Sequence, residues 1–273
     1  PDLEDGTCDD DDGLSQEELL EAIEDRREND TPASTQQEAD GEALDWGNGQ
    51  WKANTVYIEP DWSQDIAEGL VEMAVEHLKK AAMTFPKGTG LGWDGLHPRA
   101  LVRLDDWVIK WIARLLLHCE RTGRWPEEVG VCIIVLLPKA EGGYRPIGLN
   151  PWSVRLWMRC RKDTIQEWEA TVVRDYLYAG KGKGADVAVW KQAARAEAAA
   201  ATVSNKTRMA HGQVLLDLIK AFERIPHARL AREAAKLGYP LWLLRLSLAA
   251  YRLPRSLRIG QVYSFLVIAC RGA

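Results

Sequence analysis

The chain has 273 residues, and 46% of them are hydrophobic, which is enough for a sizeable core in one large or two small domains. No apolar stretch reaches 18 residues, so we expect neither a signal peptide nor a membrane span, and no membrane partner. The five cysteines are scattered without a Cys-x-x-Cys pair, which argues against a zinc site or a disulfide framework. That pattern favours a reducing, intracellular compartment, and the nucleus is one that fits.

The net charge of -5 averages two unlike parts of the chain. Residues 1–45 hold 18 acidic and 2 basic residues, a net of -16, and the remainder holds 22 acidic and 33 basic residues, a net of +11. A basic body behind an acidic segment indicates a polyanionic partner, most often a nucleic acid. A soluble domain whose Arg-rich surface reflects codon bias would have the same composition, so both interpretations stay open here.

The N-terminal part alternates charged and helical segments. Residues 1–55 are predicted to form an acidic, disordered tail, and the segment 29–42 has the composition of a linker. Within this tail, 15–29 has the capping and apolar spacing of a short helix. Further helices are predicted over 64–84 and 98–122, separated by a stretch rich in glycine.

The rest of the chain alternates helices with isolated strands. Strands are predicted where apolar and β-branched residues run together, at 131–139, 212–218 and 256–269. Helices are predicted from apolar spacing or alanine content at 151–178, 191–205, 227–238 and 239–253. The fold class is therefore mixed, with both helices and strands.

The stretch "VLLDLIKAFERIPH", residues 214–227, ends an apolar run on a carboxylate, Asp217. A strand that ends on an Asp places the carboxylate at the rim of a sheet, where its oxygens can hold Mg²⁺. An N-cap, or a surface ion pair with Lys220, would also account for an Asp at this position.

The same stretch resembles motif A of reverse transcriptases, in which an apolar run, Asp, two variable residues and Lys-Ala-Phe-Asp precede an aliphatic residue and often Pro-His. Glu223 stands where the family usually has Asp, and it keeps the acid. The resemblance implies that Asp217 is a catalytic residue and metal ligand in two-metal nucleotidyl transfer. It also places Phe222 under the sugar of the incoming deoxynucleotide, where a ring excludes a 2′-hydroxyl. A core aromatic would explain Phe222 equally well.

Upstream, "LLPKAEGGYRPIGL" resembles the fingers segment of the same family, where a strand ends in Pro-Lys and a turn leads to Arg-Pro-Ile. The resemblance implies that Lys139 and Arg145 bind the triphosphate of a deoxynucleoside triphosphate (dNTP). Arg can bind phosphate oxygens in a bidentate manner, and Lys acts as a point charge. The alternative is a pair of solvated loop cations.

Two further stretches complete the resemblance, which covers about residues 85–273. "GTGLGWDGLHPRAL" is similar to the Gly-x-Asp-Gly-aliphatic-Pro motif that precedes the fingers in non-LTR retrotransposon enzymes, with His97 before Pro98. A turn and a helix N-terminus at Asp94 would explain it as well. "YAGKGKGADVAVW" is loosely similar to the Gly/Lys-rich stretch between the fingers and motif A.

The resemblance implies the α+β fingers and partial palm of a right-hand polymerase, with helices around a small, mainly antiparallel sheet. The tail 1–55 and a helical region 56–130 would lead into the fingers, 131–211, and the partial palm, 212–273. The implied function is RNA-templated DNA synthesis, with an RNA template, a DNA primer and dNTPs as partners and Mg²⁺ as cofactor. No protein partner is implied.

One element of the family is not found in this sequence. No aromatic-x-Asp-Asp sequence follows Asp217, so we expect half of a polymerase active site, inactive in this chain alone. A non-catalytic nucleic-acid-binding remnant of a retroelement is the alternative. A basic helical interaction domain with an accidental motif match is a third hypothesis.

Overall fold

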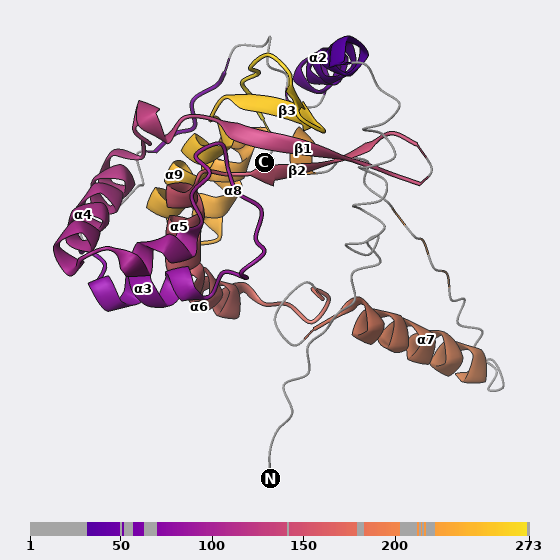
Figure 1. The fold of residues 1–273 in the computed structure, drawn as a ribbon. Coiled ribbons are helices and arrows are strands. Elements are labelled where there is room, and N and C mark those ends of the chain that lie inside the picture. Colours follow the sequence, from indigo (N-terminus) through magenta and orange to yellow (C-terminus); the bar gives the residue numbers. More distant parts are fainter. Residues whose placement is uncertain are drawn as a thin grey trace.

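The computed structural model describes most of the chain downstream of residue 31. The described residues are 32–49, 51, 57–62, 70–140, 142–178, 183–202, 212, 214, 216 and 222–271. Within them, helices surround a small mixed sheet (Figure 1), which confirms the predicted α+β class. Asp217 lies outside the described residues.

The sheet has four strands in the order β2-β1-β3-β4. Their bounds are β1 (Cys132–Pro138), β2 (Tyr144–Leu149), β3 (Arg255–Ile259) and β4 (Val262–Tyr263). The β1–β2 and β3–β4 pairs are antiparallel, whereas β1 and β3 run parallel. The central pair therefore joins two segments that are more than 100 residues apart in the sequence, through a crossover that contains most of the helices.

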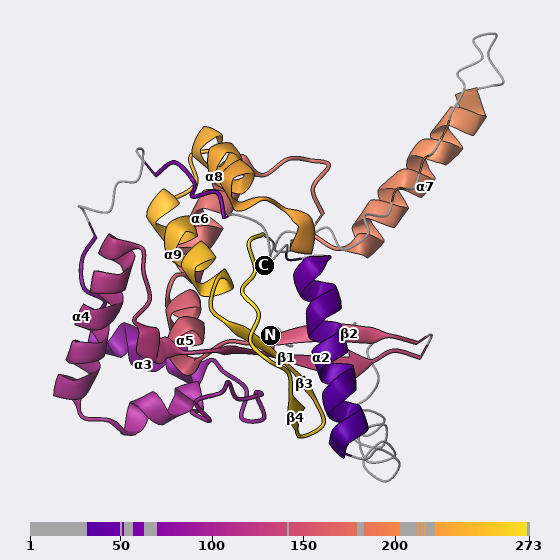
Figure 2. The ribbon, with the colours of Figure 1, turned by 90° about the horizontal axis from the view of Figure 1, so that it is seen from above.

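The helices are α2 (Pro32–Asn48), α3 (Val75–Met83), α4 (Asp106–Thr122), α5 (Trp152–Cys160), α6 (Lys162–Val172), α7 (Ala185–Thr202), α8 (His227–Lys236) and α9 (Leu241–Tyr251). Short 3-10 turns occur at η1 (Pro98–Arg103), η2 (Glu127–Val129) and η3 (Phe222–Arg224). Helix α7 projects away from the rest of the described chain in both ribbon views (Figures 1 and 2). Over the ranges described, no helix is both long and apolar enough to cross a membrane.

The core of the sheet layer follows from the alternation of side chains along β1. Cys132, Ile134 and Leu136 point to one face, where they are buried together with Leu257 of β3. Helix α2 crosses this layer next to β3 and β4 (Figure 2). Its contribution is the apolar stripe Ala39, Ala43 and Trp46, spaced four and three residues apart on one face.

A second core lies among α3, α4, α5 and α9. Its residues recur at helical spacing, as in Ile109, Ala113 and Leu116 of α4, which are all buried. Helix α4 ends at Gly123, whose φ of 65° is the left-handed conformation that closes helices at little cost for glycine.

Residues 32–48 correct the prediction of a disordered tail and linker, because they form α2. Gln36 Nε2 donates to the carbonyl of Tyr263 at 2.9 Å, and Asp40 Oδ1 accepts from the amide of Phe265 at 3.1 Å. The composition of the segment is polar, but Ala39, Ala43 and Trp46 lie on one face, which packs against the sheet. Residues 1–31 of the predicted tail lie outside the described part.

The helix predicted over 64–84 begins only at Val75 among the residues described, and the segment 70–74 is not helical. Arg121 of α4 donates to the carbonyl of Leu70 at 2.9 Å, and Arg114 pairs with Glu72 at 3.3 Å. Because α4 supplies partners for this segment, its backbone does not need the hydrogen bonds of a helix.

Three other predicted elements are divided or shortened. The helix over 98–122 is interrupted by extended backbone at Leu104 and Asp105. The helix over 151–178 breaks at Arg161 and ends at Val172. The strand over 256–269 folds back at Gly260, whose φ is 56°, to give β3 and β4. The strand over 131–139 and the helix over 227–238 are confirmed as β1 and α8.

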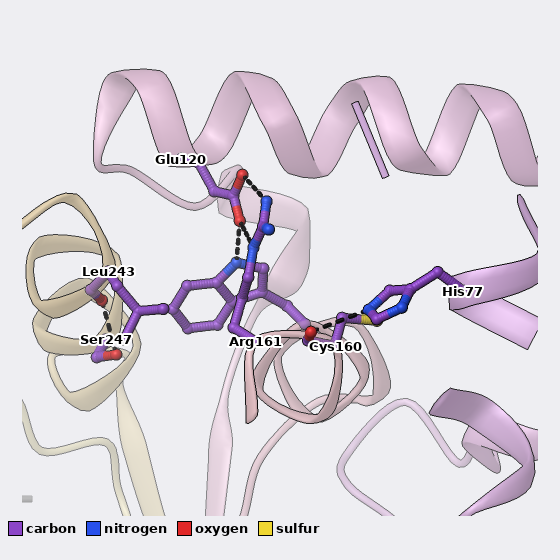
Figure 3. Close-up of polar contacts among 7 residues, drawn as sticks. His77, Glu120, Cys160, Arg161, Leu243 and Ser247 are labelled. Atoms are coloured by element: carbon purple, nitrogen blue, oxygen red, sulfur yellow. Dashed lines mark hydrogen bonds and ion pairs between the residues drawn. The ribbon is translucent and has the colours of Figure 1, made fainter. Parts of the chain in front are cut away.

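A buried ion pair connects the helices of the second core (Figure 3). Arg161 donates from Nε and Nη2 to the two carboxylate oxygens of Glu120, each at 2.6 Å. Trp157 Nε1 donates to Oε1 of the same carboxylate at 2.7 Å. The side chain of Glu120 is fully buried, and these three donors replace the water that it loses. Nearby, His77 Nε2 lies 3.0 Å from the carbonyl oxygen of Cys160, joining α3 to α5.

We predict that Arg161→Met lowers the free energy of unfolding by about 3–5 kcal/mol, because it leaves the Glu120 charge buried without its cation. Lys79→Met is the matched control: its ion pair with Asp106 is largely exposed, and such pairs contribute about 0–1 kcal/mol. Urea unfolding of both variants measures the difference. Equal losses of unfolding free energy in the two variants would show that the buried pair stabilises the fold no more than the partly exposed pair does.

Candidate functional site

The β1–β2 hairpin carries Lys139 and Arg145, the two cations that the fingers resemblance singles out. Arg145 is paired with Leu137 across the hairpin, and Lys139 follows the last pair, Pro138 with Tyr144. The turn closes with two hydrogen bonds, from Lys139 N to Gly143 O at 3.0 Å and from Gly142 N to Lys139 O at 3.1 Å. The φ values of 91° and 79° at Gly142 and Gly143 suit glycine and allow this tight reversal.

Both cations are exposed, and the register places them on one face of the hairpin. Directly paired residues of antiparallel strands share a face, so Arg145 lies on the face of Leu137. Lys139, two residues after Leu137, continues the same alternation. This face is opposite to the one that Cys132, Ile134 and Leu136 bury in the core. The hairpin therefore presents two positive charges to solvent from the side away from α2.

The stretch that contains Gly90, Gly92 and Asp94 packs directly on the end of this hairpin. A Cβ added at Gly90 would lie 3.2 Å from Cδ2 of Leu149 in β2. A Cβ added at Gly92 would lie 2.7 Å from the carbonyl oxygen of Asn150. The glycines therefore permit an approach that other residues would block. Two motifs that the sequence analysis treated separately form one contiguous structure.

Asp94 joins these motifs through its carboxylate. Its Oδ2 accepts from the amide of Trp152, the first residue of α5, at 2.7 Å, and its Oδ1 accepts from the amide of Leu96 at 3.1 Å. Asp94 thus forms a turn, as the alternative interpretation held, but the helix that it caps is α5. That helix lies 58 residues downstream of Asp94. No local sequence signal identifies a capping partner at such a separation.

The motif A stretch is described only in part. Asp217 lies outside the described residues, so its role stays a prediction. Gly212, Val214 and Leu216 belong to no strand where the predicted one was expected, and Val214 and Leu216 are exposed. The described sheet ends at β2 on one side and at β4 on the other, and Gly212, Val214 and Leu216 belong to neither strand.

Phe222 is described as the first residue of η3. Its side chain is 77% exposed, so it lies at the surface and is not a core aromatic. Its role beside the substrate remains a prediction.

Two properties of the described titratable groups bear on catalysis: their clustering and the pKa values of the buried thiols. Among the residues that the structure describes, no group of three or more His, Cys, Asp or Glu side chains could hold a metal. Burial raises the pKa of Cys119 and Cys132 to about 11, and that of Cys160 to about 12. At neutral pH these three thiols stay protonated, so they are poor nucleophiles.

A basic cluster on α5 and the start of α6 was not predicted from the sequence. Arg155, Arg159 and Lys162 line a cavity of about 500 Å³, next to the stretch that carries Gly90. Their spacing of four and three residues places them on one face of a helix, which is the signal that could have revealed them. Within the predicted helix 151–178, basic residues at that spacing would also occur on a helix face that is simply exposed to solvent.

We predict that Gly92→Ala lowers the free energy of unfolding by about 1–3 kcal/mol, because its Cβ would clash with the backbone of Asn150. Gly88→Ala is the matched control, since a Cβ there meets nothing within 4 Å. That variant should be neutral or stabilising by about 0.4–1 kcal/mol. Urea denaturation compares the two, and an equal response at both positions would argue against the close packing at Gly92.

Comparison with known proteins does not assign the chain to a family. No protein-family model matches the sequence, and no curated protein matches it either. The functional interpretation therefore depends on the motifs and on the geometry of this site.

Proposed function

We propose that this chain provides the fingers and partial palm of a reverse transcriptase-like enzyme and binds an RNA template with a DNA primer. The observation that carries the proposal is the hairpin, which presents Lys139 and Arg145 on one exposed face. The Gly-x-Asp-Gly stretch packs against its end, and motif A follows in the sequence, in the order that the resemblance requires.

Charge supports a polyanionic ligand. The chain beyond residue 45 has a net charge of +11, from 33 bases and 22 acids. Lys and Arg that contact phosphates displace condensed counterions, which favours binding at low salt. Neither Lys139 nor Arg145 forms an ion pair within the part of the chain that the structure describes. Both side chains are therefore available to a phosphate ligand.

The catalytic assignments remain part of the proposal. Asp217 would be the metal ligand of motif A, and Phe222 would contact the sugar of the incoming dNTP. Bound Mg²⁺ would supply Lewis-acid stabilisation of the phosphoryl oxygens. Lys139 and Arg145 would hold the triphosphate, with Arg145 donating in a bidentate manner and Lys139 as a point charge.

A second function, nucleic-acid binding without catalysis, is favoured by charge, because the net charge of +11 beyond residue 45 can bind a polyanion without a catalytic site. Asp217 is the metal ligand that the motif A resemblance identifies. A single carboxylate cannot hold two Mg²⁺ ions in register for in-line transfer. Both functions share the binding step, so binding and synthesis need separate experiments.

For binding, we expect the chain to bind a fluorescent RNA–DNA duplex with an affinity that falls steeply as salt rises. Lys139→Gln/Arg145→Gln should reduce the slope of log K against log salt concentration by about 2, because each lost phosphate contact reduces it by about 0.9. Lys110→Gln/Arg229→Gln removes the same charge from exposed positions on α4 and α8 and serves as the control. Fluorescence anisotropy across a salt series measures both. Salt-insensitive or absent binding would contradict the proposal.

For synthesis, we expect no primer extension by this chain alone with Mg²⁺ and all four dNTPs. Loss of part of a metal site costs several kcal/mol of transition-state stabilisation, and each 1.36 kcal/mol is about tenfold in rate. The assay is gel-based extension of a labelled DNA primer on an RNA template, with Asp217→Ala as the control. Extension that Asp217→Ala abolishes would show that this chain contains a complete site and would exclude the non-catalytic alternative.

A further inference from the structure

A cavity of about 500 Å³ lies between the loop after α3 and the helices α5 and α6. Phe85 and Thr89 line it from the loop, Arg155 and Arg159 from α5, and Lys162 from α6. Its size falls in the range of small-ligand pockets, about 300–1,000 Å³. None of the motifs that the resemblance uses includes these three cations.

The ring of Phe85 contacts the guanidinium groups of both Arg155 and Arg159. Its ring is 5% exposed, and the guanidinium carbons of Arg155 and Arg159 lie 5.3 Å and 4.7 Å from its centroid. Stacking on a ring orients a guanidinium and leaves its edge donors free for a ligand. The two like charges are thus held over one side chain, an arrangement that an anion between them would stabilise.

The two arginines differ in their hydrogen bonds. Arg155 is anchored, because Nη1 donates to the carbonyl of Gly90 and Nη2 to Oγ1 of Thr89, each at 2.5 Å. The side chains of Arg159 and Lys162 form no hydrogen bond or ion pair with any part of the chain that the structure describes. Burial, and then the neighbouring charge of Arg159, lower the pKa of Arg155, against the opposing effect of Asp94. The cluster therefore has donors that the protein does not use.

The lining has a net charge of +2, from three cations and one carboxylate, Glu169. A planar guanidinium beside an ammonium matches the oxygens of a phosphate group better than it matches a single carboxylate. The volume exceeds what phosphate alone requires, and the apolar side chains of Phe85, Met158 and Ile165 offer a surface for a base or sugar.

We propose that this cavity binds a nucleotide phosphate, with Arg159 and Lys162 as the ligand donors and Arg155 as the residue that positions the loop. The phosphate comes either from a free mononucleotide or from a residue of a bound strand. The second source rests on the proposed function, because it requires that the chain binds a polynucleotide. The cavity shares no lining residue with the hairpin that carries Lys139 and Arg145, and the Gly90 stretch contacts both Arg155 of α5 and Leu149 of β2.

The test uses the whole chain and three probes: inorganic phosphate, adenosine 5′-monophosphate, and a single-stranded RNA without a terminal phosphate. Isothermal titration compares the wild type with Arg159→Gln/Lys162→Gln and with Lys110→Gln/Arg229→Gln, which removes the same charge elsewhere. We expect the pocket variant to lose about tenfold in affinity for adenosine 5′-monophosphate, and the control to stay within about twofold. If the pocket variant does not fold, Lys162→Gln, at an exposed position, replaces it.

The probes separate the sources of the phosphate. A loss confined to adenosine 5′-monophosphate assigns the pocket to a free mononucleotide, and an equal loss for the RNA assigns it to a strand. Equal affinities of wild type and pocket variant for all three probes would overturn the pocket, while salt-dependent duplex binding would leave the proposed function intact. Binding of adenosine 5′-monophosphate that depends on Arg159 and Lys162, without any binding of RNA, would uphold the pocket and contradict the proposed function.

Discussion

The buried carboxylate of Glu120 is the interaction on which the arrangement of the helices depends. A charge without solvent exposure is tolerated only when its oxygens are fully bonded, and here Arg161 and Trp157 provide all three donors. Since Glu120 lies on α4, Trp157 on α5 and Arg161 at the junction with α6, satisfying one carboxylate fixes three helices at once. The position of α6, and with it that of Lys162 at the cavity, follows from this junction.

The hairpin is positioned by a different kind of constraint, close backbone approach. Helix α5 follows β2 after only two residues, and its first amide is bonded by Asp94. Gly90 and Gly92 allow that stretch to lie against β2 and the start of α5. The hairpin is thus held at its base by two glycines and one carboxylate, while its tip carries Lys139 into solvent. The contacts at the base fix the direction in which the hairpin extends toward its exposed tip.

Helices and strands whose own apolar residues and end signals mark their bounds could be predicted from the sequence. β1 is a β-branched run that ends at a proline, and α8 ends at Gly238 in the left-handed conformation. α2 could not be predicted from its polar composition, because its stability comes from the sheet beneath it. The cations of the hairpin were found through a motif, whereas the cavity was not, since it depends on Phe85 approaching α5 from a distant part of the sequence.

Arg159 and Arg161 show why local sequence cannot separate a structural charge from a binding one. They have the same side chain and lie two residues apart, so helical geometry directs them about 200° apart around the axis. Arg161 meets the buried carboxylate of Glu120 and is needed to keep that charge in the interior. Arg159 lies over the ring of Phe85, and it lines the same cavity as Lys162. Exchanging Glu120 and Arg161 together for apolar residues would remove the buried pair and leave the charge of the cluster at Arg159 unchanged. The two roles are therefore separable by mutation even though the residues are neighbours in the sequence.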